Sequence, residues 1–268
     1  GITRPCVKHN FMITDVSKMA ETIKKAFYVA TTGRPGPVVV DIPKDITEDK
    51  CEFNYPSKVS MRSYDPYTDI SDESLELAAK NILSCKKPVI YAGGGVINSN
   101  ASKELTEFAK YLNFPVTNTL MGLGCFPGND PQFIQMLGMH GSYEANMAMH
   151  DCDLLIAVGA RFDDRITGRL DKFSPDAKII HIDVDPSSIS KNIKAHIPII
   201  GDVKAAINGL TKKIVEKKLK PNNIDEWWNN INEWRKKDSF RYKQGSAIIK
   251  PQYVIDRLYE ITKGDAFI

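Results

Sequence analysis

The segment Asp153–Gly168, DLLIAVGARFDDRITG, constrains the fold most, because an apolar run ends at a glycine and opens onto charged residues. Leu154 to Val158 are typical of a buried strand with charge on both sides. Gly159 lets the backbone turn there. Four charged residues follow: Arg161, Asp163, Asp164 and Arg165. Open parallel sheets bind ligands at the carboxyl ends of strands, so these residues indicate either a ligand site or a solvated salt-bridge cluster.

The composition predicts a soluble globular chain. Its 268 residues suffice for one large or two small domains, and 42% hydrophobic and 26% charged residues are ordinary values. No apolar run reaches the roughly 20 residues of a membrane span, and no secretory signal peptide is visible. The formal charge of +3 is small, and the lysines between 212 and 243 alternate with acidic residues. We therefore expect neither a membrane nor a nucleic acid as partner.

The cysteines are scattered singly, with no C-x-x-C pair: Cys6, Cys51, Cys85, Cys125 and Cys152. An odd number at such spacing indicates neither a disulfide framework nor a zinc site, and it fits a reducing compartment. The five histidines lack the i, i+4 spacing of a helical metal pair. We therefore predict no metal site within this chain.

The chain begins with too few elements to form a domain by itself. Apolar residues from Val16 to Ala30 recur at helical spacing, Gly33 and Pro35 end that helix, and Val38–Ile42 form a short apolar strand. One helix and one strand cannot bury both of their faces. We interpret residues 1–47 as the end of a larger α/β domain and residues 48–70 as a linker.

Residues 71–210 alternate between strands and helices, starting from Ser71 as a helix N-cap. The expected strands span residues 89–92, 115–118, 154–158, 178–183 and 197–200. A glycine-rich loop, MGLGCFPGNDP, is long enough to be functional. This alternation predicts an α/β fold with a doubly wound parallel sheet of about six strands.

The last part of the chain breaks this alternation. Residues 211–249 read as linker helices, in which Trp227, Trp228 and Trp234 are packing anchors. A helix after Pro251 and a strand in GDAFI make residues 250–268 the start of a further domain. The central domain is therefore expected to be flanked by pieces of two further α/β domains.

Two glycine-rich places at strand ends carry chemistry. Gly93, Gly94 and Gly95 would let a diphosphate approach main-chain amides, although their spacing is not G-x-G-x-x-G and a simple turn explains them equally well. The second place combines two segments, the loop from Thr119 to Gly124 and the residues Met139, His140 and Gly141. That mixture suits the pocket of a planar ring, the alternative being a loop packed on its own methionines.

Two charged places complete the set. The guanidiniums of Arg161 and Arg165 can bind phosphate or carboxylate in bidentate fashion. Asp183 in HIDVDP stands where a strand end can hold a ribose hydroxyl, and Asp202 follows the next strand, although either could be a helix N-cap. Four such places on one sheet edge favour a dinucleotide site.

Six motifs carry a family resemblance, in chain order: GRPGPVVVDIPKDI, TLMGLG, MLGMHGSYEAN, AVGARFDDRITG, KIIHIDVDPSSISKN and GDV. Through them the chain resembles, from end to end, the catalytic subunit of acetolactate synthase, also called acetohydroxyacid synthase. That family comprises three-domain thiamine diphosphate enzymes. Their first and third domains build the thiamine site across a dimer interface, and their middle domain binds FAD.

The resemblance implies roles for residues of this chain. The FAD contacts would be Arg34, Gly93, Gly94, Gly95, Thr119, Leu120, Met121, His140, Gly141, Gly159, Arg161, Asp163, Asp183, Val184 and Asp202. The substrate channel would include Lys44, Met139, Asp164 and Arg165. Cys125 departs from the pattern, which leads us to expect a small or hydroxylated residue. The catalytic glutamate and the motif for Mg²⁺ and diphosphate would lie outside this chain, so no catalytic residue is assigned within it.

The resemblance also implies an activity. The parent enzyme would condense pyruvate with pyruvate or 2-ketobutyrate to acetolactate or acetohydroxybutyrate, for isoleucine, valine and leucine biosynthesis. We expect a homodimer or homotetramer with a regulatory small subunit, in the bacterial cytoplasm or in an organelle if eukaryotic, and no activity of this chain alone. The alternatives are glyoxylate carboligase, pyruvate oxidase or a non-catalytic FAD-binding module. The glycine spacing argues against a nicotinamide dehydrogenase.

Overall fold

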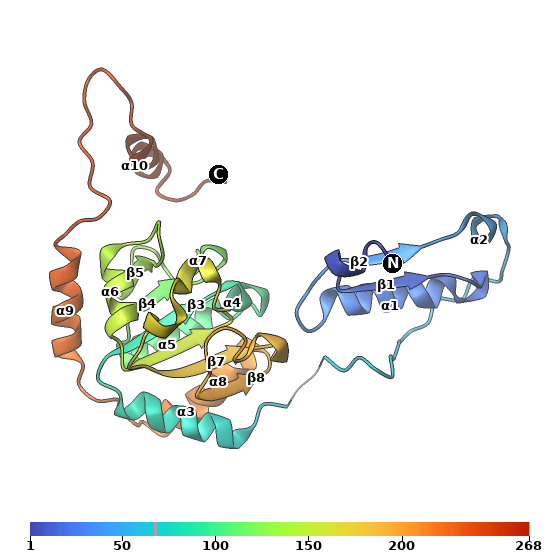
Figure 1. The fold of residues 1–268 in the computed structure, drawn as a ribbon, viewed down its shortest axis with the longest axis horizontal. Helices are drawn as coiled ribbons and strands as arrows, with labels where there is room; N and C mark the ends of the chain where they lie inside the picture. Colours follow the sequence, from blue (N-terminus) through green and yellow to red (C-terminus); the bar gives the residue numbers. More distant parts are fainter. Residues whose placement is uncertain (67–68, 268) are drawn as a thin grey trace.

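The computed structural model describes residues 1–66 and 69–267 (Figure 1). Three parts follow one another: an N-terminal unit (residues 1–48), a central unit (residues 71–235) and a C-terminal helix on an extended segment. Residues 67 and 68 of the expected linker, and residue 268 of the expected last domain, lie outside the described residues. No helix in the described part of the chain is both long and apolar enough to cross a membrane.

The central unit contains six strands, all parallel, in the order β5-β4-β3-β6-β7-β8. The strands are β3 (Pro88–Ala92), β4 (Val116–Asn118), β5 (Phe133–Met136), β6 (Leu154–Val158), β7 (Lys178–Asp183) and β8 (Ile197–Ile200). This confirms the predicted doubly wound sheet. β5 was not predicted, and it is irregular, with a positive φ at Gln135 and a register shift against β4.

The order of the strands reverses between β3 and β6. From β3 the chain moves outward to β4 and β5, then returns and adds β6, β7 and β8 on the other side. The carboxyl ends of β3 and β6 therefore lie together at the topological switch point, where open α/β sheets bind ligands.

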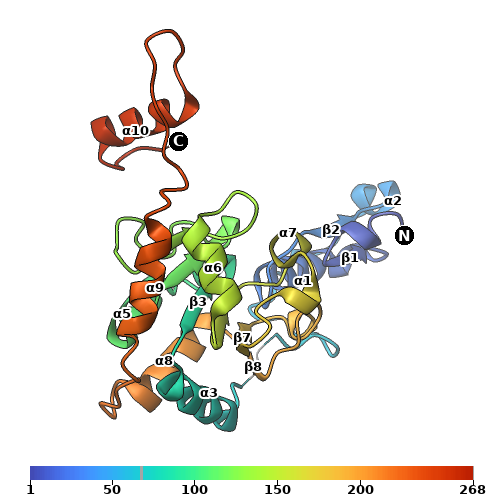
Figure 2. The same ribbon diagram turned by 60° about the vertical axis from the view of Figure 1, so that its left-hand side comes forward.

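Helices cover both faces of this sheet. Its helices are α3 (Asp72–Ser84), α4 (Gly94–Asn98), α5 (Ser102–Leu112), α6 (Tyr143–Asp151), α7 (Asp164–Thr167), α8 (Val203–Ile214) and α9 (Asp225–Arg235). α3 and α5 pack against α8, whereas α6 packs against α9 (Figure 2). Right-handed crossovers that run in opposite directions pass over opposite faces, so α5 and α6 lie on different faces. Every residue of β3 and β6 is consequently buried.

Local signals explain where the elements of the central unit begin. Ser71 caps α3, as predicted, because its side chain accepts a hydrogen bond from the Ser74 amide. Trp227 is buried, and its Nε1 donates to the Pro88 carbonyl at 3.0 Å, which anchors α9 against the start of β3. Three short 3-10 helices lie in the connections: η3 (Leu120–Gly122), η4 (Leu170–Lys172) and η5 (Pro186–Ser188).

The N-terminal unit is a two-stranded parallel sheet beside one long helix. Its elements are η1 (Arg4–Cys6), β1 (His9–Met12), η2 (Val16–Lys18), α1 (Met19–Thr31), β2 (Val38–Asp41) and α2 (Lys44–Glu48). The helix and the strand β2 were predicted. β1 and α2 were not, because HNFM has no β-branched residue, unlike VVVD in β2, and a helix of five residues is too short to show a helical period.

The C-terminal helix α10 (Pro251–Thr262) was also predicted, but the strand expected in GDAFI does not form over residues 264–267. A strand needs a neighbouring strand to receive its backbone hydrogen bonds. Figure 1 shows α10 at the end of a long loop, away from both sheets.

Candidate functional site

The predicted cofactor residues gather at one edge of the central sheet. All six strands are parallel, so their carboxyl ends open at the same edge. Loops after β3, β4, β5, β6, β7 and β8 bring every predicted site residue of the central unit to that edge. The two remaining residues, Arg34 and Lys44, belong to the N-terminal unit.

Gly93, Gly95 and Gly159 occupy the switch point, where two turns touch. A Cβ on Gly93 would lie 2.3 Å from the Gly159 carbonyl oxygen, and one on Gly95 would lie 2.6 Å from the Gly159 Cα. The Gly95 amide donates to the Gly159 carbonyl at 3.0 Å. Close packing of the two backbones therefore requires glycine at these positions, so the turn interpretation accounts for Gly93 and Gly95 without a ligand.

The segment after β6 forms a charged turn. Asp163 caps α7 by accepting a hydrogen bond from the Arg165 amide, and Arg161 Nη2 lies 3.2 Å from Asp163 Oδ2. Hydrogen bonds with Asp164 and with the Arg165 amide lower the pKa of Asp163, which is therefore an anion at neutral pH. The salt-bridge interpretation is thus correct for one pair, and it holds Arg161 at the sheet edge.

Arg161 faces a cavity of about 210 Å³, here called the arginine cavity. Its lining is Arg34, Arg161, Phe162, Asp163, Asp164, Ser187, Ser188, Lys191 and Asn192. Arg34 reaches it from the N-terminal unit, with Nη1 at 3.3 Å from both Asp185 Oδ2 and Ser188 Oγ. Both guanidiniums are at least half exposed, so their remaining donors are open to an anion.

His181 of β7 packs against the charged turn after β6, and it was not predicted to have a role in the site. Its ring is fully buried, its Nε2 lies 3.0 Å from the Ala160 carbonyl, and it packs edge-on against Phe162 at 5.1 Å. Burial lowers the pKa of His181, so the ring is neutral and Nε2 carries the proton donated to Ala160. Its inward position in the strand KIIHID was the one available signal.

The two acidic strand ends differ. Asp202 caps α8 by accepting from the Ala205 amide at 3.0 Å, which confirms the N-cap alternative for that residue. Asp183 instead accepts from the Asp185 amide at 2.8 Å, and burial raises the pKa of its carboxyl group. That hydrogen bond uses Oδ1 and none is made to Oδ2 by the described residues, so Oδ2 can accept from a hydroxyl donor; Val184 follows directly.

Apolar side chains stand exposed at the same edge. Thr119 caps η3, and the following Leu120 and Met121 are exposed, Met121 at 75%. Met139, just before His140 and Gly141, is 81% exposed. The methionines are therefore not packed within their own loops, which removes that alternative and leaves an apolar surface for a ring.

Lys44 is not brought to this edge. It starts α2, its side chain is 88% exposed, and it pairs with Glu48 at 3.6 Å. Both views place α2 at the end of the N-terminal unit far from the central sheet. Cys125 is buried in its loop, and burial raises the pKa of its thiol to about 11. No cluster of three or more metal-ligating side chains occurs among the described residues.

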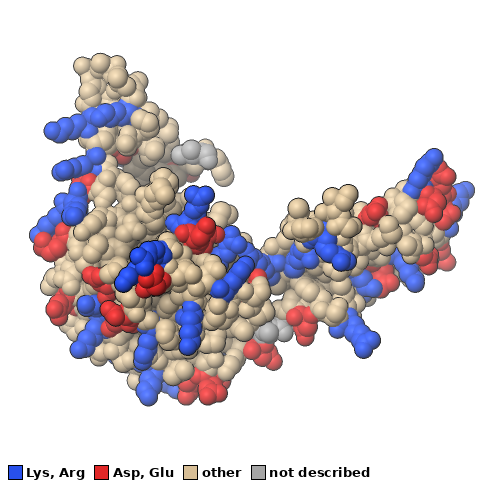
Figure 3. Space-filling model, in the orientation of Figure 1, with Lys and Arg blue, Asp and Glu red and all other residues tan. Residues whose placement is uncertain are grey.

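The residues at this edge fit a flavin dinucleotide. The arginine cavity provides cations for a diphosphate, Asp183 provides an acceptor for a ribose hydroxyl, and Met121 and Met139 provide an apolar surface. Elsewhere on the face in Figure 3 the two charge signs are mixed, with no single-sign stripe of the kind that follows a nucleic-acid backbone.

Residues 75–210 match the family model described as thiamine pyrophosphate enzyme, central domain. The chain is 48% identical over 270 residues to the acetolactate synthase large subunit of Buchnera aphidicola (Schizaphis graminum), with 100% of this chain and 47% of the relative covered. It is 47% identical over 271 residues to that of Haemophilus influenzae, with the same coverage. It is 45% identical over 272 residues to acetolactate synthase isozyme 3 large subunit of Escherichia coli, also covering 100% and 47%. The chain thus spans about half the length of these curated relatives.

Proposed function

This chain belongs to the thiamine pyrophosphate enzyme family, and from that premise we propose that it is part of an acetolactate synthase large subunit whose central unit binds FAD. The single observation that carries the FAD assignment is the arginine cavity, where Arg34 and Arg161 from different units face one space. The names of the relatives support the activity, and they do not favour glyoxylate carboligase, pyruvate oxidase or a non-catalytic module.

In this proposal FAD lies along the carboxyl edge of the sheet. Arg34 and Arg161 hold its diphosphate, Asp183 accepts a hydrogen bond from a ribose hydroxyl, and Met121 and Met139 flank the ring. The other residues predicted from the sequence remain proposed FAD contacts; for Gly93, Gly95 and Asp202 this role would be additional to the turn and N-cap roles described for them. FAD serves as a structural cofactor that stabilises this edge.

The reaction that we propose for the whole enzyme condenses pyruvate with pyruvate or 2-ketobutyrate. Thiamine diphosphate, held with Mg²⁺ outside this chain, supplies the chemistry that removes carbon dioxide from pyruvate. Arg165 is exposed and makes no ion pair within the described part of the chain, so it can bind a 2-ketoacid carboxylate. Met139 provides an apolar wall and Asp164 lies beside Arg165. Lys44 would reach such a channel only from another subunit.

The proposed assembly is a homodimer or homotetramer of the large subunit with a regulatory small subunit. Its proposed role is the synthesis of isoleucine, valine and leucine in the cytoplasm. The relatives come from bacteria and are named as large subunits of acetolactate synthase, which supports this proposal.

FAD titration of the Arg161→Ala chain tests the cofactor site. Loss of a charge-assisted hydrogen bond costs about 1.5 to 3 kcal/mol, so we expect Kd to rise roughly ten- to a hundredfold. Arg241→Ala, which removes an exposed arginine outside the arginine cavity, is the matched control and should leave Kd unchanged. An unchanged Kd for Arg161→Ala, with an unaltered circular dichroism spectrum, would contradict the site. Thermal stabilisation by NADH but not by FAD would contradict the cofactor.

Activity is tested separately. We expect the 268-residue chain, supplied with pyruvate, thiamine diphosphate, Mg²⁺ and FAD, to form no acetolactate, because the catalytic groups are placed outside it. Colorimetric detection of acetoin after acid decarboxylation would measure the product. Turnover comparable to that of a full-length large subunit would show that the catalytic groups lie within this chain after all.

A further inference from the structure

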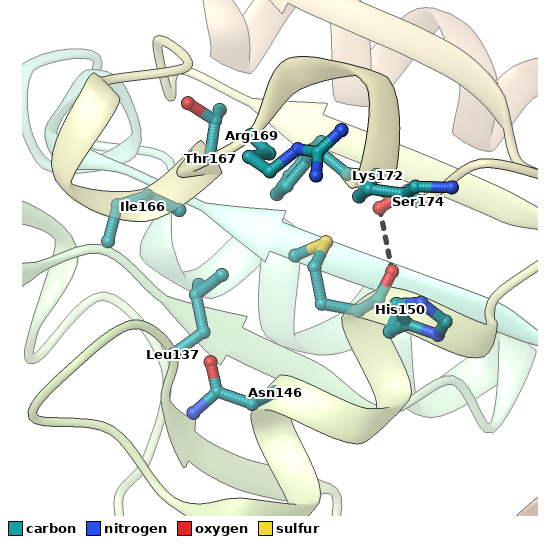
Figure 4. Close-up of a pocket in the computed structure, with 10 residues that line it drawn as sticks. Leu137, Asn146, His150, Ile166, Thr167, Arg169, Lys172 and Ser174 are labelled. Atoms are coloured by element: carbon teal, nitrogen blue, oxygen red, sulfur yellow. Dashed lines mark hydrogen bonds between the residues drawn. The ribbon is translucent and has the colours of Figure 1, made fainter.

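A second cavity, of about 180 Å³, lies between α6 and the segment from α7 to Ser174; we call it the α6 cavity (Figure 4). It lies on the other side of α7 from the arginine cavity. Asp163 and Asp164 line the arginine cavity, whereas Ile166 and Thr167 line the α6 cavity. The two cavities share no lining residue, so the α6 cavity is separate from the proposed FAD site.

The floor of the α6 cavity is apolar. Leu137 and Met149 are buried there, and Ile166 and Phe173 complete the surface. The polar groups among these side chains already have partners: Ser174 Oγ donates to the Met149 carbonyl at 2.6 Å (Figure 4), and the Asn146 side chain is bonded to Gly138. The floor therefore offers apolar contacts to a ligand, and the polar side chains Ser174 and Asn146 need no hydrogen bond from it.

The rim of the α6 cavity carries basic groups only. Arg169 and Lys172 come from one side and His150 from α6 on the other, and no acidic residue lines the space. Arg169 is bonded to Asp171 through two contacts of 3.1 and 2.7 Å, and His150 Nδ1 lies 2.7 Å from Asp151. Lys172 has no acidic partner within the described part of the chain. Its ammonium is the uncompensated charge at this rim.

We propose that the α6 cavity binds a small organic monocarboxylate with a short apolar chain. The carboxylate lies against the ammonium of Lys172, and the apolar chain contacts Met149 and Phe173. The cavity is smaller than the roughly 300 Å³ at which sites for drug-sized molecules begin, so the ligand is small. This accessory site goes beyond the proposed function and does not depend on it.

Methyl NMR of the 268-residue chain tests the proposal with isobutyrate as the probe and isobutyramide as its uncharged isostere. We expect isobutyrate to shift the signals of the Met149 ε-methyl and the Ile166 δ1-methyl in a saturable way. Isobutyramide should bind at least tenfold more weakly, because it lacks the charge that Lys172 recognises.

Two charge reversals make the assignment specific. Lys172→Glu should weaken isobutyrate binding at least tenfold, whereas Lys80→Glu, at an exposed lysine of α3, should not change it. Absence of saturable shifts, equal affinity for the amide, or unchanged binding in Lys172→Glu would each overturn the proposal. FAD titration of Lys172→Glu reads the arginine cavity independently, so failure of one site does not imply failure of the other.

Discussion

The central unit and the N-terminal unit contain similar apolar strands, yet they bury them differently. In β6 all five residues of LLIAV are buried, whereas the three valines of β2 are only partly buried. Both runs predict strands, and both form strands. An apolar run therefore predicts the element, while the number of layers around the element decides its burial.

The layers themselves account for the difference. β6 has a strand on each side and helices over both faces, whereas β2 has β1 on one side and α1 beside it. Met12 and Phe27 of the N-terminal unit remain largely exposed, as do Ile255 and Ile261 of α10. Exposed apolar surface of this kind marks faces that other protein surfaces cover. It supports the interpretation of both regions as pieces of flanking domains.

Thiol reactivity should separate the two units most strongly. Cys6 and Cys51 of the N-terminal region are exposed, whereas the other three cysteines are buried in the central unit. Burial raises the pKa of Cys85 to about 12, against about 8.5 for an ordinary thiol, so its thiolate population falls at least about a thousandfold. With iodoacetamide at pH 8, we expect mass spectrometry to find two fast adducts.

The remaining three thiols should react only after urea is added. Cys152 is protected in the same way, since burial raises the pKa of its thiol to about 12. Native-state alkylation of Cys85 or Cys152 at the rate of Cys51 would show that the central unit is not the closed core described above.

A pair of identical substitutions compares the central unit with α10. Ile231 of α9 is fully buried, whereas Ile255 of α10 is 66% exposed. Ile231→Ala should lower the free energy of unfolding by about 2 to 5 kcal/mol, because it leaves a cavity. Ile255→Ala should change it by less than about 0.5 kcal/mol. Urea unfolding followed by tryptophan fluorescence measures both, and equal costs would show that α10 is packed as firmly as α9.

Much of the fold of the central unit was predictable from the sequence because local residues mark its strands, helices and caps. Ser71, the apolar run of β6 and the helix of Trp227 each follow from neighbouring residues. β1 and β5 were not predicted, because HNFM and FIQM contain at most one β-branched residue, whereas the equally short strands β2 (VVVD) and β8 (IPII) contain three each. The strand predicted after α10 does not form over residues 264–267, because no neighbouring strand in the described part of the chain pairs with this segment.

The gathering of the candidate site residues was predictable, whereas their individual contacts were less so. Strand ends marked by Gly159 and Asp183 predicted that these residues share one edge of the sheet, since parallel topology brings such ends together. His181 supports the segment after β6 through its packing against Phe162, which the sequence does not show. Lys191 lines the arginine cavity only because of the fold of the loop after β7. Lys44 shows that a motif match does not by itself bring a residue to this edge within one chain.

The pH dependence of stability tests the burial of His181. The folded chain keeps the ring neutral because burial lowers its pKa, whereas the unfolded chain takes up a proton as the pH falls through about 6.5. The unfolded state then binds more protons, so the free energy of unfolding falls below about pH 6.5, by up to about 1.4 kcal/mol per pH unit. Urea titrations between pH 7.5 and 5 should show a shallower decline for His181→Gln. An identical decline would mean that water reaches the ring.

The smallest expected effect concerns the contact between the two units. Arg34 of the N-terminal unit lies 3.3 Å from Asp185 of the central unit, and its side chain is half exposed. Exposed ion pairs contribute about 0 to 1 kcal/mol and are screened by salt, so Asp185→Asn should cost less than about 1 kcal/mol, and less still in 0.5 M NaCl. Asparagine keeps the cap of η5 that Asp185 provides through the Ser187 amide, so the substitution reports on the ion pair. Asp171→Asn, which breaks the exposed pair with Arg169 inside the central unit, is the matched control and should cost a similar amount. If Asp185→Asn instead cost more than about 2 kcal/mol while Asp171→Asn did not, Arg34 would be holding the two units as one folded body, and the contrast drawn between them would fail.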